Sequence, residues 1–219
     1  MKDIVSFHLV IVCLLLMNNY DKMFYDEVNK LDHRPNLLVH VCCGPCSVYP
    51  LVLLNKYFNI TIYYANSNIF PYQEYEKRIK TLEEYLKILN EDIKLIIPPY
   101  DKKFMAKLAP YATCKEGMER CAKCYSLRML EAYNYAKKHN FEYFTTIMSI
   151  SNHKNANYIN RIGYNLEKRI GGVKYLYADF KKQGGIDNNR KMNKELNLYE
   201  QDYCGCIYSL NDYKKKLSS

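Results

Sequence analysis

The architecture of this chain follows from one segment, Leu37-Leu38-Val39-His40-Val41-Cys42-Cys43-Gly44-Pro45-Cys46-Ser47. Its apolar, β-branched first half predicts a buried strand. The cysteines, glycine and proline that follow predict a loop leading into a helix. Three thiols therefore gather where the strand ends. Packing alone does not explain this cluster, since a thiol gains from burial anywhere in a core.

Strand-like and helix-like segments alternate along the rest of the chain. Further strands are predicted at residues 59–65, 94–97, 141–150 and 173–177. Helices are predicted at residues 21–31, 48–57, 74–89, 125–139, 155–169 and 191–199, with a glycine- and lysine-rich loop at 181–190. This alternation is typical of a Rossmann-like α/β fold, a parallel sheet with helices on both faces. Ligands of such folds bind at the carboxyl ends of the strands, so we expect a cysteine-lined metal site there.

Length and composition indicate a single folded α/β domain at residues 19–219. The chain has 219 residues, of which 48% are hydrophobic and 25% are charged, as in ordinary globular proteins. Its formal net charge is +9, from 32 basic and 23 acidic residues. A basic balance suits a polyanionic partner such as nucleic acid, although a lysine-rich proteome gives the same balance.

Residues 1–18 form an N-terminal extension. Ile4 to Met17 is mostly apolar, but its 14 residues are too few to cross a membrane. The segment also lacks the basic leader and small-residue cleavage site of a signal peptide. It is expected to be an extra helix or the product of an over-long gene prediction, with the true start at Met17 or Met23. We therefore expect a cytoplasmic protein without membrane attachment, in which Cys13 belongs to no site.

Nine cysteines occur, and eight of them fall into three groups. The groups are Cys42, Cys43 and Cys46; Cys114, Cys121 and Cys124; and Cys204 and Cys206. Grouped cysteines in a chain without secretory features indicate metal or redox chemistry in a reducing compartment.

A Cys-x-x-Cys motif, Cys121 to Cys124, lies at the start of a predicted helix, where the backbone dipoles favour thiolate over thiol. Together with Cys42 and Cys43 it offers four thiolates, a set that zinc or an iron–sulfur cluster could use. Adjacent cysteines suit a single tetrahedral ion poorly because neighbouring side chains diverge, whereas a cluster takes one thiolate at each of several irons. The residues therefore favour an iron–sulfur cluster, with zinc as the alternative.

The remaining motifs are less specific. Cys204-Gly205-Cys206 either ligates metal or forms a strained, readily reduced disulfide with a redox role. Cys46 is a further candidate metal ligand, and His40 is interpreted as a core residue. The sequence contains no GxxxxGK[ST], GxGxxG or HExxH motif. A basic run at residues 154–174 is either a solvated face or a contact for tRNA phosphates.

These motifs resemble the cobalamin-independent epoxyqueuosine reductase family (QueH). The resemblance is carried by HVCCGPCS (40–47), YANSNIFPYQEYEKR (64–78), ERCAKCYSLR (119–128), YFTTIMSIS (143–151), YLYADF (175–180) and LYEQDYCGCIYS (198–209). It covers the chain from about residue 19 to residue 209, and the order and spacing of the cysteine motifs make it specific.

The resemblance implies that residues 19–219 are a catalytic domain that reduces the epoxide of epoxyqueuosine at the tRNA wobble position. This is the last step of queuosine synthesis, and its partners would be the modified tRNA and an electron donor that the sequence does not identify. The resemblance further implies a 4Fe–4S cluster on Cys42, Cys43, Cys121 and Cys124. The alternative function is a zinc-stabilised tRNA-binding domain without redox activity.

Further roles are implied for residues near the cluster. Cys204 and Cys206 would be a redox-active pair or would contribute to a second metal site. A mononuclear iron near the cluster, with Cys46 as one of its ligands, would polarise the epoxide oxygen. Asp179 and Tyr203 are candidate proton donors.

Overall fold

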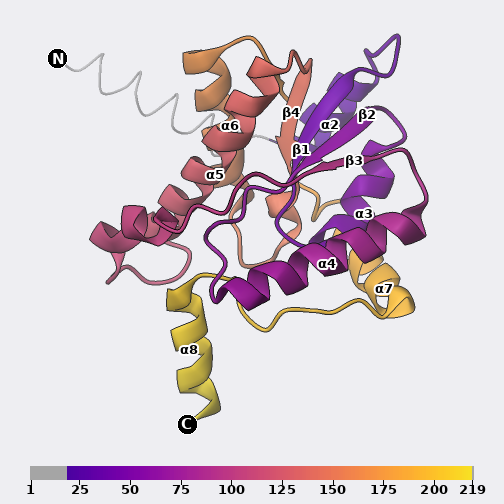
Figure 1. Cartoon of the computed structure of the whole chain (residues 1–219). Helices are drawn as coiled ribbons and strands as arrows, with labels where there is room; N and C mark the ends of the chain where they lie inside the picture. The colour runs from indigo at the N-terminus through magenta and orange to yellow at the C-terminus, as the bar shows by residue number, and fades with distance from the viewer. Residues whose placement is uncertain (1–18, 219) are drawn as a thin grey trace, which may run out of the picture.

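A five-stranded parallel sheet forms the centre of the computed structural model, which describes residues 19–218 (Figure 1). The strands are β1 (Asn36–His40), β2 (Asn59–Tyr63), β3 (Lys94–Ile96), β4 (Tyr143–Thr146) and β5 (Lys174–Tyr175). Their spatial order is β3-β2-β1-β4-β5, and every neighbouring pair is parallel. The apolar segment 4–17 and Cys13 lie outside the described residues.

The central position of β1 follows from its sequence. Leu37, Leu38 and Val39 are completely buried, because both faces of this strand are covered by helices. In register, Leu38 lies opposite Thr61 of β2 and Phe144 of β4. This continuous apolar run is typical of a parallel strand that is enclosed on both faces.

His40 ends β1 as a core residue, as the sequence predicted. Its ring is completely buried, with Nδ1 at 2.8 Å from Thr146 Oγ1 and Nε2 at 3.2 Å from the carbonyl oxygen of Ala65. Burial lowers the pKa of His40 to about 3, and the nearby Arg128 adds to this effect. The ring is therefore neutral and ties the ends of neighbouring strands together.

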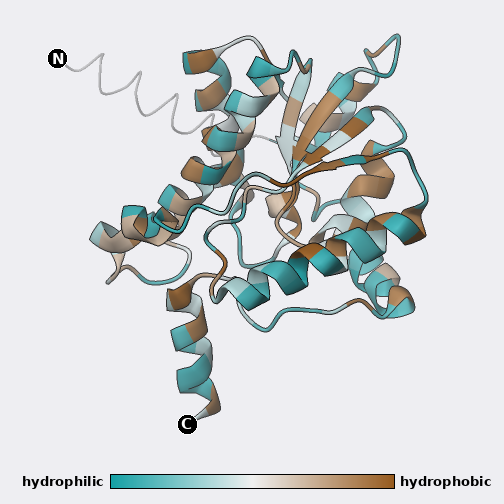
Figure 2. Ribbon diagram, viewed as in Figure 1, coloured by the Kyte–Doolittle hydropathy of each residue, from teal (hydrophilic) through white to brown (hydrophobic). Residues whose placement is uncertain are grey.

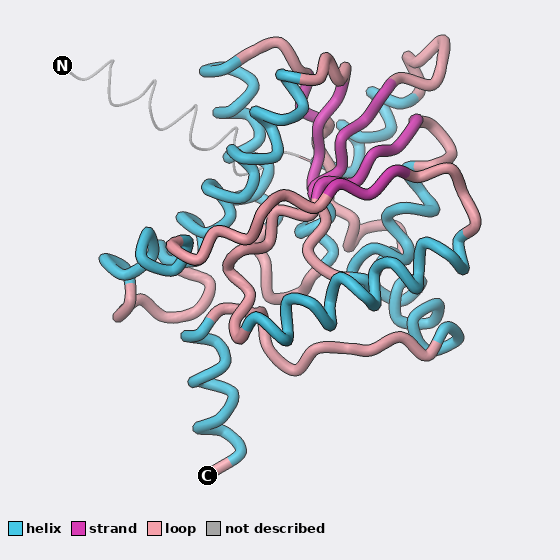
Figure 3. Tube along the Cα trace, in the orientation of Figure 1, coloured by secondary structure: helices cyan, strands magenta, loops and turns pink. Residues whose placement is uncertain are grey.

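Helices cover both faces of the sheet, which confirms the expected Rossmann-like architecture. The described helices are α2 (Tyr20–Val28), α3 (Gly44–Leu54), α4 (Tyr72–Leu89), η1 (Phe104–Tyr111), α5 (Glu119–Lys138), η2 (Ile147–Ile150), α6 (Ala156–Ile170), α7 (Gly185–Leu196) and α8 (Ile207–Leu217). Helices α5 and α6 pack together on one face, and α3 packs with α4 and α7 on the other (Figures 1 and 3). Hydrophobic residues concentrate along the strands, as Figure 2 shows. Within residues 19–218, no helix is long and apolar enough to span a lipid bilayer.

Several helices begin earlier than predicted, and two of these differences affect the surroundings of the cysteines. Helix α3 begins at Gly44 instead of residue 48, with Pro45 in its first turn, so Cys46 lies on a helix and not in a loop. Helix α7 begins at Gly185, inside the segment predicted as a loop. Its Asn193 donates a hydrogen bond to the carbonyl oxygen of Pro45 at 2.8 Å. Such packing between distant segments fixes α7, and local sequence patterns do not report it.

The strand order places a topological switch point beside the cysteines. The chain runs from β1 to β2 on one side of the sheet and from β4 to β5 on the other side. The connections that follow β1 and β4 therefore diverge and leave a crevice at the carboxyl ends of these two strands, where open α/β sheets bind ligands. Cys42 and Cys43 follow β1 at this point.

Candidate metal centre

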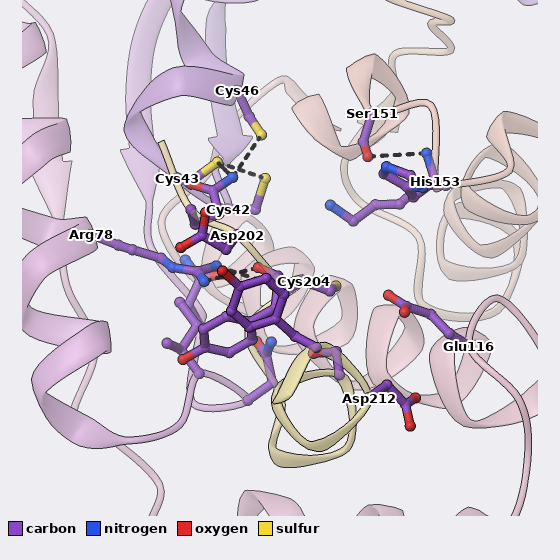
Figure 4. A pocket seen from close by; sticks show the side chains of 18 of the residues that line it. Cys42, Cys43, Cys46, Arg78, Glu116, Ser151, His153, Asp202, Cys204 and Asp212 are labelled. Carbon is purple, nitrogen blue, oxygen red and sulfur yellow. Dashed lines mark hydrogen bonds between the residues drawn. The ribbon is translucent and has the colours of Figure 1, made fainter. Parts of the chain in front are cut away.

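Three thiols converge at the carboxyl end of β1. Cys42 and Cys43 follow the strand, Cys46 lies in the first turn of α3, and their Sγ atoms all lie within 4.8 Å of one another. The Sγ atoms of Cys42 and Cys43 are 3.9 Å apart. Figure 4 shows the three sulfurs on one side of a cavity. Among residues 19–218, this thiol triad is the only group of three or more His, Cys, Asp or Glu side chains close enough to hold one metal ion.

The three thiols of the triad have very different pKa values. Hydrogen bonds from the thiols of Cys43 and Cys46 hold the pKa of Cys42 well below its usual range. Burial, together with the neighbouring Cys42, raises the pKa of Cys43 to about 12. The same hydrogen bonds raise the pKa of Cys46. The metal-free triad therefore favours a single thiolate, and a bound metal would displace the remaining protons.

The thiol triad lines a cavity of about 270 Å³, here called the cysteine cavity. Its other walls come from the segment after β2 (residues 66–69), α4, Glu116, α5, the segment after η2, and C-terminal residues between 201 and 216 (Figure 4). This volume is at the small end of ligand sites, so it suits one ring-sized group and not a whole nucleotide.

A second group of thiols lies on α5 and before α8. Cys121 and Cys124 are buried in the first turns of α5, Cys204 lines the cysteine cavity, and Cys206 caps α8. Burial raises the pKa of Cys124 to about 12, and nearby Cys204 and Cys206 contribute to the increase. Burial also raises the pKa of Cys121, and Cys204 and Cys206 add to this increase. The structure thus brings these four thiols into electrostatic contact. None of them lies within 4.8 Å of all three triad sulfurs.

Two cations lie near both groups of thiols. Burial by itself would lower the pKa of Arg128, but its charge interactions with Cys124 and Cys42 outweigh burial and raise it. Burial would likewise lower the pKa of Lys154, but charge interactions with Cys42 and Cys204 raise it instead. Both side chains therefore carry positive charge, which favours the thiolate forms of these cysteines.

Arg78 of α4 fixes the backbone beside Cys204. The residue is 2% exposed, and its Nε donates to Glu74 Oε1 at 2.7 Å. Its two terminal nitrogens donate to the carbonyl oxygens of Cys204, at 3.1 Å, and Tyr203, at 3.0 Å. Tyr199 donates to the same Glu74 carboxylate, at 3.0 and 3.1 Å from its two oxygens. Helix α4 thereby holds the segment that carries the Cys-Gly-Cys motif.

Two residues that line the cysteine cavity have buried carboxamide oxygens without a hydrogen-bond partner. Gln201 Nε2 donates to Cys43 Sγ at 3.3 Å and lies 4.0 Å from Cys46 Sγ, but its Oε1 is buried without a hydrogen-bond partner. Asn68, which is 2% exposed, has an equally unpartnered Oδ1. Leaving a buried acceptor unpaired is unfavourable unless a ligand supplies the donor. Both residues lie in stretches that carry the family resemblance, 64–78 and 198–209, but the sequence analysis assigned neither of them a role in the site.

The two candidate proton donors lie in different places. Tyr203 lines the cysteine cavity, donates to the carbonyl oxygen of Phe70 at 2.5 Å, and has a pKa that burial raises to about 12. Asp179 lies outside that cavity, in an adjoining one, with Oδ1 at 3.0 Å from Lys181 Nζ.

Known proteins match most of the chain. The family model described as epoxyqueuosine reductase QueH matches residues 37–212. A relative named epoxyqueuosine reductase QueH from Staphylococcus aureus is 38% identical over 201 residues, which cover 87% of this chain and 83% of the relative. Relatives with the same name come from Streptococcus pyogenes serotype M1, 34% identical over 88% of this chain and 80% of the relative, and Thermotoga maritima, 30% identical over 82% and 93%.

A solved structure shares the fold. The U34-tRNA thiolase NcsA from Methanococcus maripaludis, solved with its [4Fe-4S] cluster, aligns with a TM-score of 0.54 and 14% identity. The alignment covers 90% of this chain and 72% of the thiolase chain. At this identity the likeness concerns the fold alone.

Proposed function

This chain belongs to the epoxyqueuosine reductase QueH family, and from that membership we propose the reaction and the residues that perform it. The protein reduces the epoxide of epoxyqueuosine at the tRNA wobble position, which is the last step of queuosine biosynthesis. Both carbon–oxygen bonds of the epoxide break, a carbon–carbon double bond forms, and the oxygen leaves as water after taking up two electrons and two protons. The observation that supports this best is the convergence of three thiols within 4.8 Å beside a ring-sized cavity.

The donor set fits an iron–sulfur cluster. We propose that Cys42, Cys43, Cys121 and Cys124 hold a 4Fe–4S cluster, since thiolates are the usual ligands of its irons. When bound, such a cluster would supply electrons one at a time. The nearby positive charges of Arg128 and Lys154, described above, favour several thiolates at one place.

The remaining thiols suit supporting roles. We propose that Cys46 contributes to a second site for a mononuclear iron, which would supply Lewis acidity toward the departing oxygen. Cys204 and Cys206 are proposed as a redox-active pair, because Cys204 faces the cysteine cavity and a Cys-Gly-Cys disulfide is readily reduced.

Polar side chains of the cysteine cavity hold the substrate. Asn68 Oδ1 and Gln201 Oε1 accept hydrogen bonds from donors on the modified ring, which satisfies two acceptors that are buried without partners in the free protein. The ring is thereby oriented beside Cys43, the residue to which Gln201 already donates.

Protons reach the cavity from its charged walls. Glu116, Lys154 and Asp202 line the cysteine cavity, and Lys154 also lines the adjoining cavity that contains Asp179. We propose that Asp179 supplies protons through this adjoining cavity without touching the epoxide. The tRNA substrate places the protein in the cytoplasm, where an electron donor of low potential is also needed.

Anaerobic purification followed by a reductase assay tests the proposal. We expect a brown protein with about four iron and four sulfide per chain, with extra iron if the second site is filled. With a strong chemical reductant, it should convert epoxyqueuosine in tRNA to queuosine, as measured by mass spectrometry of the digested nucleosides. Cys43→Ser and Cys124→Ser should each lose iron and activity. Cys114→Ser is the matched control. Although Cys114 is near Cys121 in sequence, it belongs neither to the thiol triad nor to the residues that line the cysteine cavity, so this variant should keep its iron and its activity.

Two outcomes would contradict this proposal. A colourless protein that contains zinc and binds tRNA would indicate a zinc-stabilised binding domain instead. A brown protein that leaves epoxyqueuosine unchanged under every strong reductant would retain the cluster and refute the reductase reaction.

A further inference from the structure

A second cavity adjoins the cysteine cavity. It has a volume of about 1030 Å³ and shares Tyr125, His153 and Lys154 with the cysteine cavity. Its other walls are largely polar, with four asparagines at positions 19, 152, 155 and 157. The modified nucleotide is part of a polynucleotide, so an RNA strand must leave the small cavity once the ring has entered it. The larger cavity provides a polar exit.

The outer face of α6 continues from this exit. Tyr158 lines the larger cavity and is 48% exposed. Arg161, Tyr164 and Lys168 follow along α6 at intervals of three, three and four residues, which places all four side chains on one helical face. All four are exposed, and Lys168 Nζ lies 5.8 Å from the centre of the Tyr164 ring.

This face, here called the α6 face, carries two basic residues. Acidic residues lie near its Lys168 end, where Glu167 and, from α2, Asp26 and Glu27 line a cavity together with Lys168. Asp26 and Glu27 are already paired with Lys22 and Lys174. The one acidic residue of α6, Glu167, is half-buried and accepts a hydrogen bond from the backbone nitrogen of Tyr175 at 3.4 Å. Tyrosines alternating with basic residues are the side chains that bind single-stranded RNA, because rings stack on bases and cations pair with phosphates.

We propose that the α6 face binds the RNA strand that flanks the modified nucleotide. Arg161 and Lys168 contact phosphates, and Tyr158, at the mouth of the larger cavity, stacks on a neighbouring base. This inference rests on the proposed function for the identity of the RNA. The location of the RNA-binding surface depends only on the shared wall of the two cavities and on the residues of α6.

Helix α4 offers a matched control surface. Lys80 and Lys87 are exposed and seven residues apart, the same spacing as Arg161 and Lys168. They stand beside exposed Glu83 and Glu84, so their surroundings are unsuited to a polyanion. Double charge reversal at either pair changes the net charge by the same amount.

Fluorescence anisotropy with an anticodon stem-loop RNA that carries unmodified guanine at the wobble position tests the proposal. The protein is the full chain loaded with its cluster, and circular dichroism verifies folding of each variant. We expect the R161E/K168E variant to bind at least tenfold more weakly than wild type. The slope of log affinity against log salt should become shallower by about 1.5, the loss of roughly two phosphate contacts. The K80E/K87E variant should change affinity less than about threefold.

Stacking is tested separately. Tyr158→Ala should weaken binding of the same RNA by about tenfold, and Tyr158→Phe should restore it because the ring is kept. If both variants bind like wild type, the assignment of Tyr158 to a base is wrong.

The outcomes separate this inference from the proposed function. Equal loss of binding in R161E/K168E and K80E/K87E would overturn the α6 assignment, even if the wild type reduces epoxyqueuosine. Binding that depends on α6 in a protein without reductase activity would support the RNA surface and refute the reductase reaction. If the wild type bound vesicles of phosphatidylglycerol but not the stem-loop, the α6 face would be a membrane contact and the inference would be overturned.

Discussion

Replacing Arg78 by methionine removes the contact that holds the Cys-Gly-Cys segment on α4. Methionine keeps most of the apolar stem of the side chain but none of its donors. The Glu74 carboxylate and the carbonyl oxygens of Tyr203 and Cys204 then lose their shared partner. Glu74 keeps the Tyr199 hydroxyl, so its charge is not left without any hydrogen bond.

The expected loss of stability follows from burial. Removing one partner of a buried ion pair is unfavourable by about 3–5 kcal/mol. Arg78 is 3% and Glu74 12% exposed in their side chains, so this range applies. Because Tyr199 still hydrogen-bonds Glu74, we expect the lower end, about 3 kcal/mol. Locally, residues 203–206 should become more mobile, whereas the sheet should not.

Urea unfolding and thiol labelling measure the two effects. The Arg78→Met protein should unfold with a free energy lower by about 3 kcal/mol, and Cys204 and Cys206 should react faster with an alkylating reagent in the metal-free protein. Arg78→Lys should lose about half as much stability, because one ammonium cannot reach all three acceptors. Lys80→Met, on the exposed side of the same helix, is the control and should change stability by less than about 0.5 kcal/mol. If Arg78→Met matches Lys80→Met in both measurements, Arg78 does not hold this segment.

Three further predictions concern the core, the surface and the substrate site. Gly163→Ala places a methyl carbon 2.1 Å from the buried Tyr175 ring. Urea unfolding should therefore show a free energy of unfolding lower by about 2–3 kcal/mol. An unchanged unfolding midpoint would mean that the ring moves to make room. Burial opposes ionisation of Glu27, but hydrogen bonds from Lys174 and Tyr143 outweigh it and lower the pKa of Glu27 below its ordinary 4.5. The stability from this carboxylate is thus present above pH 4.5 and lost as pH falls through the lower, folded-state pKa. Glu27→Gln should therefore lose less stability than wild type between pH 6 and pH 3. Parallel curves of unfolding free energy against pH for the two proteins would refute this. Asn68→Leu should lower kcat/KM by about tenfold without lowering the free energy of unfolding, because it removes an acceptor that only the substrate satisfies. A fall in stability with an unchanged kcat/KM would refute the role assigned to Asn68.

Local patterns predicted the sheet and the position of the first cysteines. The apolar run at residues 37–41 identified β1, and strand–helix alternation identified the parallel sheet, because both signals depend on neighbouring residues. The Cys-x-x-Cys motif was correctly placed at the start of a helix, α5. The assignment of a cluster to Cys42, Cys43, Cys121 and Cys124 stays a prediction.

Contacts between distant segments could not be predicted in this way. Arg78 is separated by 126 positions from Cys204, whose carbonyl oxygen it binds. Gln201 contacts Cys43 across 158 positions. The early start of α7 has the same origin, since glycine-rich residues 184–185 suggest a loop and only packing against α3 stabilises a helix there.

The closing of the site by residues 199–206 has a consequence for biosynthesis. The sheet and the thiol triad are complete in sequence by Tyr175 and can form before residues 199–206 are synthesised. Gln201 and the Cys-Gly-Cys segment follow the sheet and the thiol triad along the chain, so this wall of the cavity is synthesised after the triad. We therefore expect the thiol triad to be open to an incoming metal until residues 199–206 pack over it.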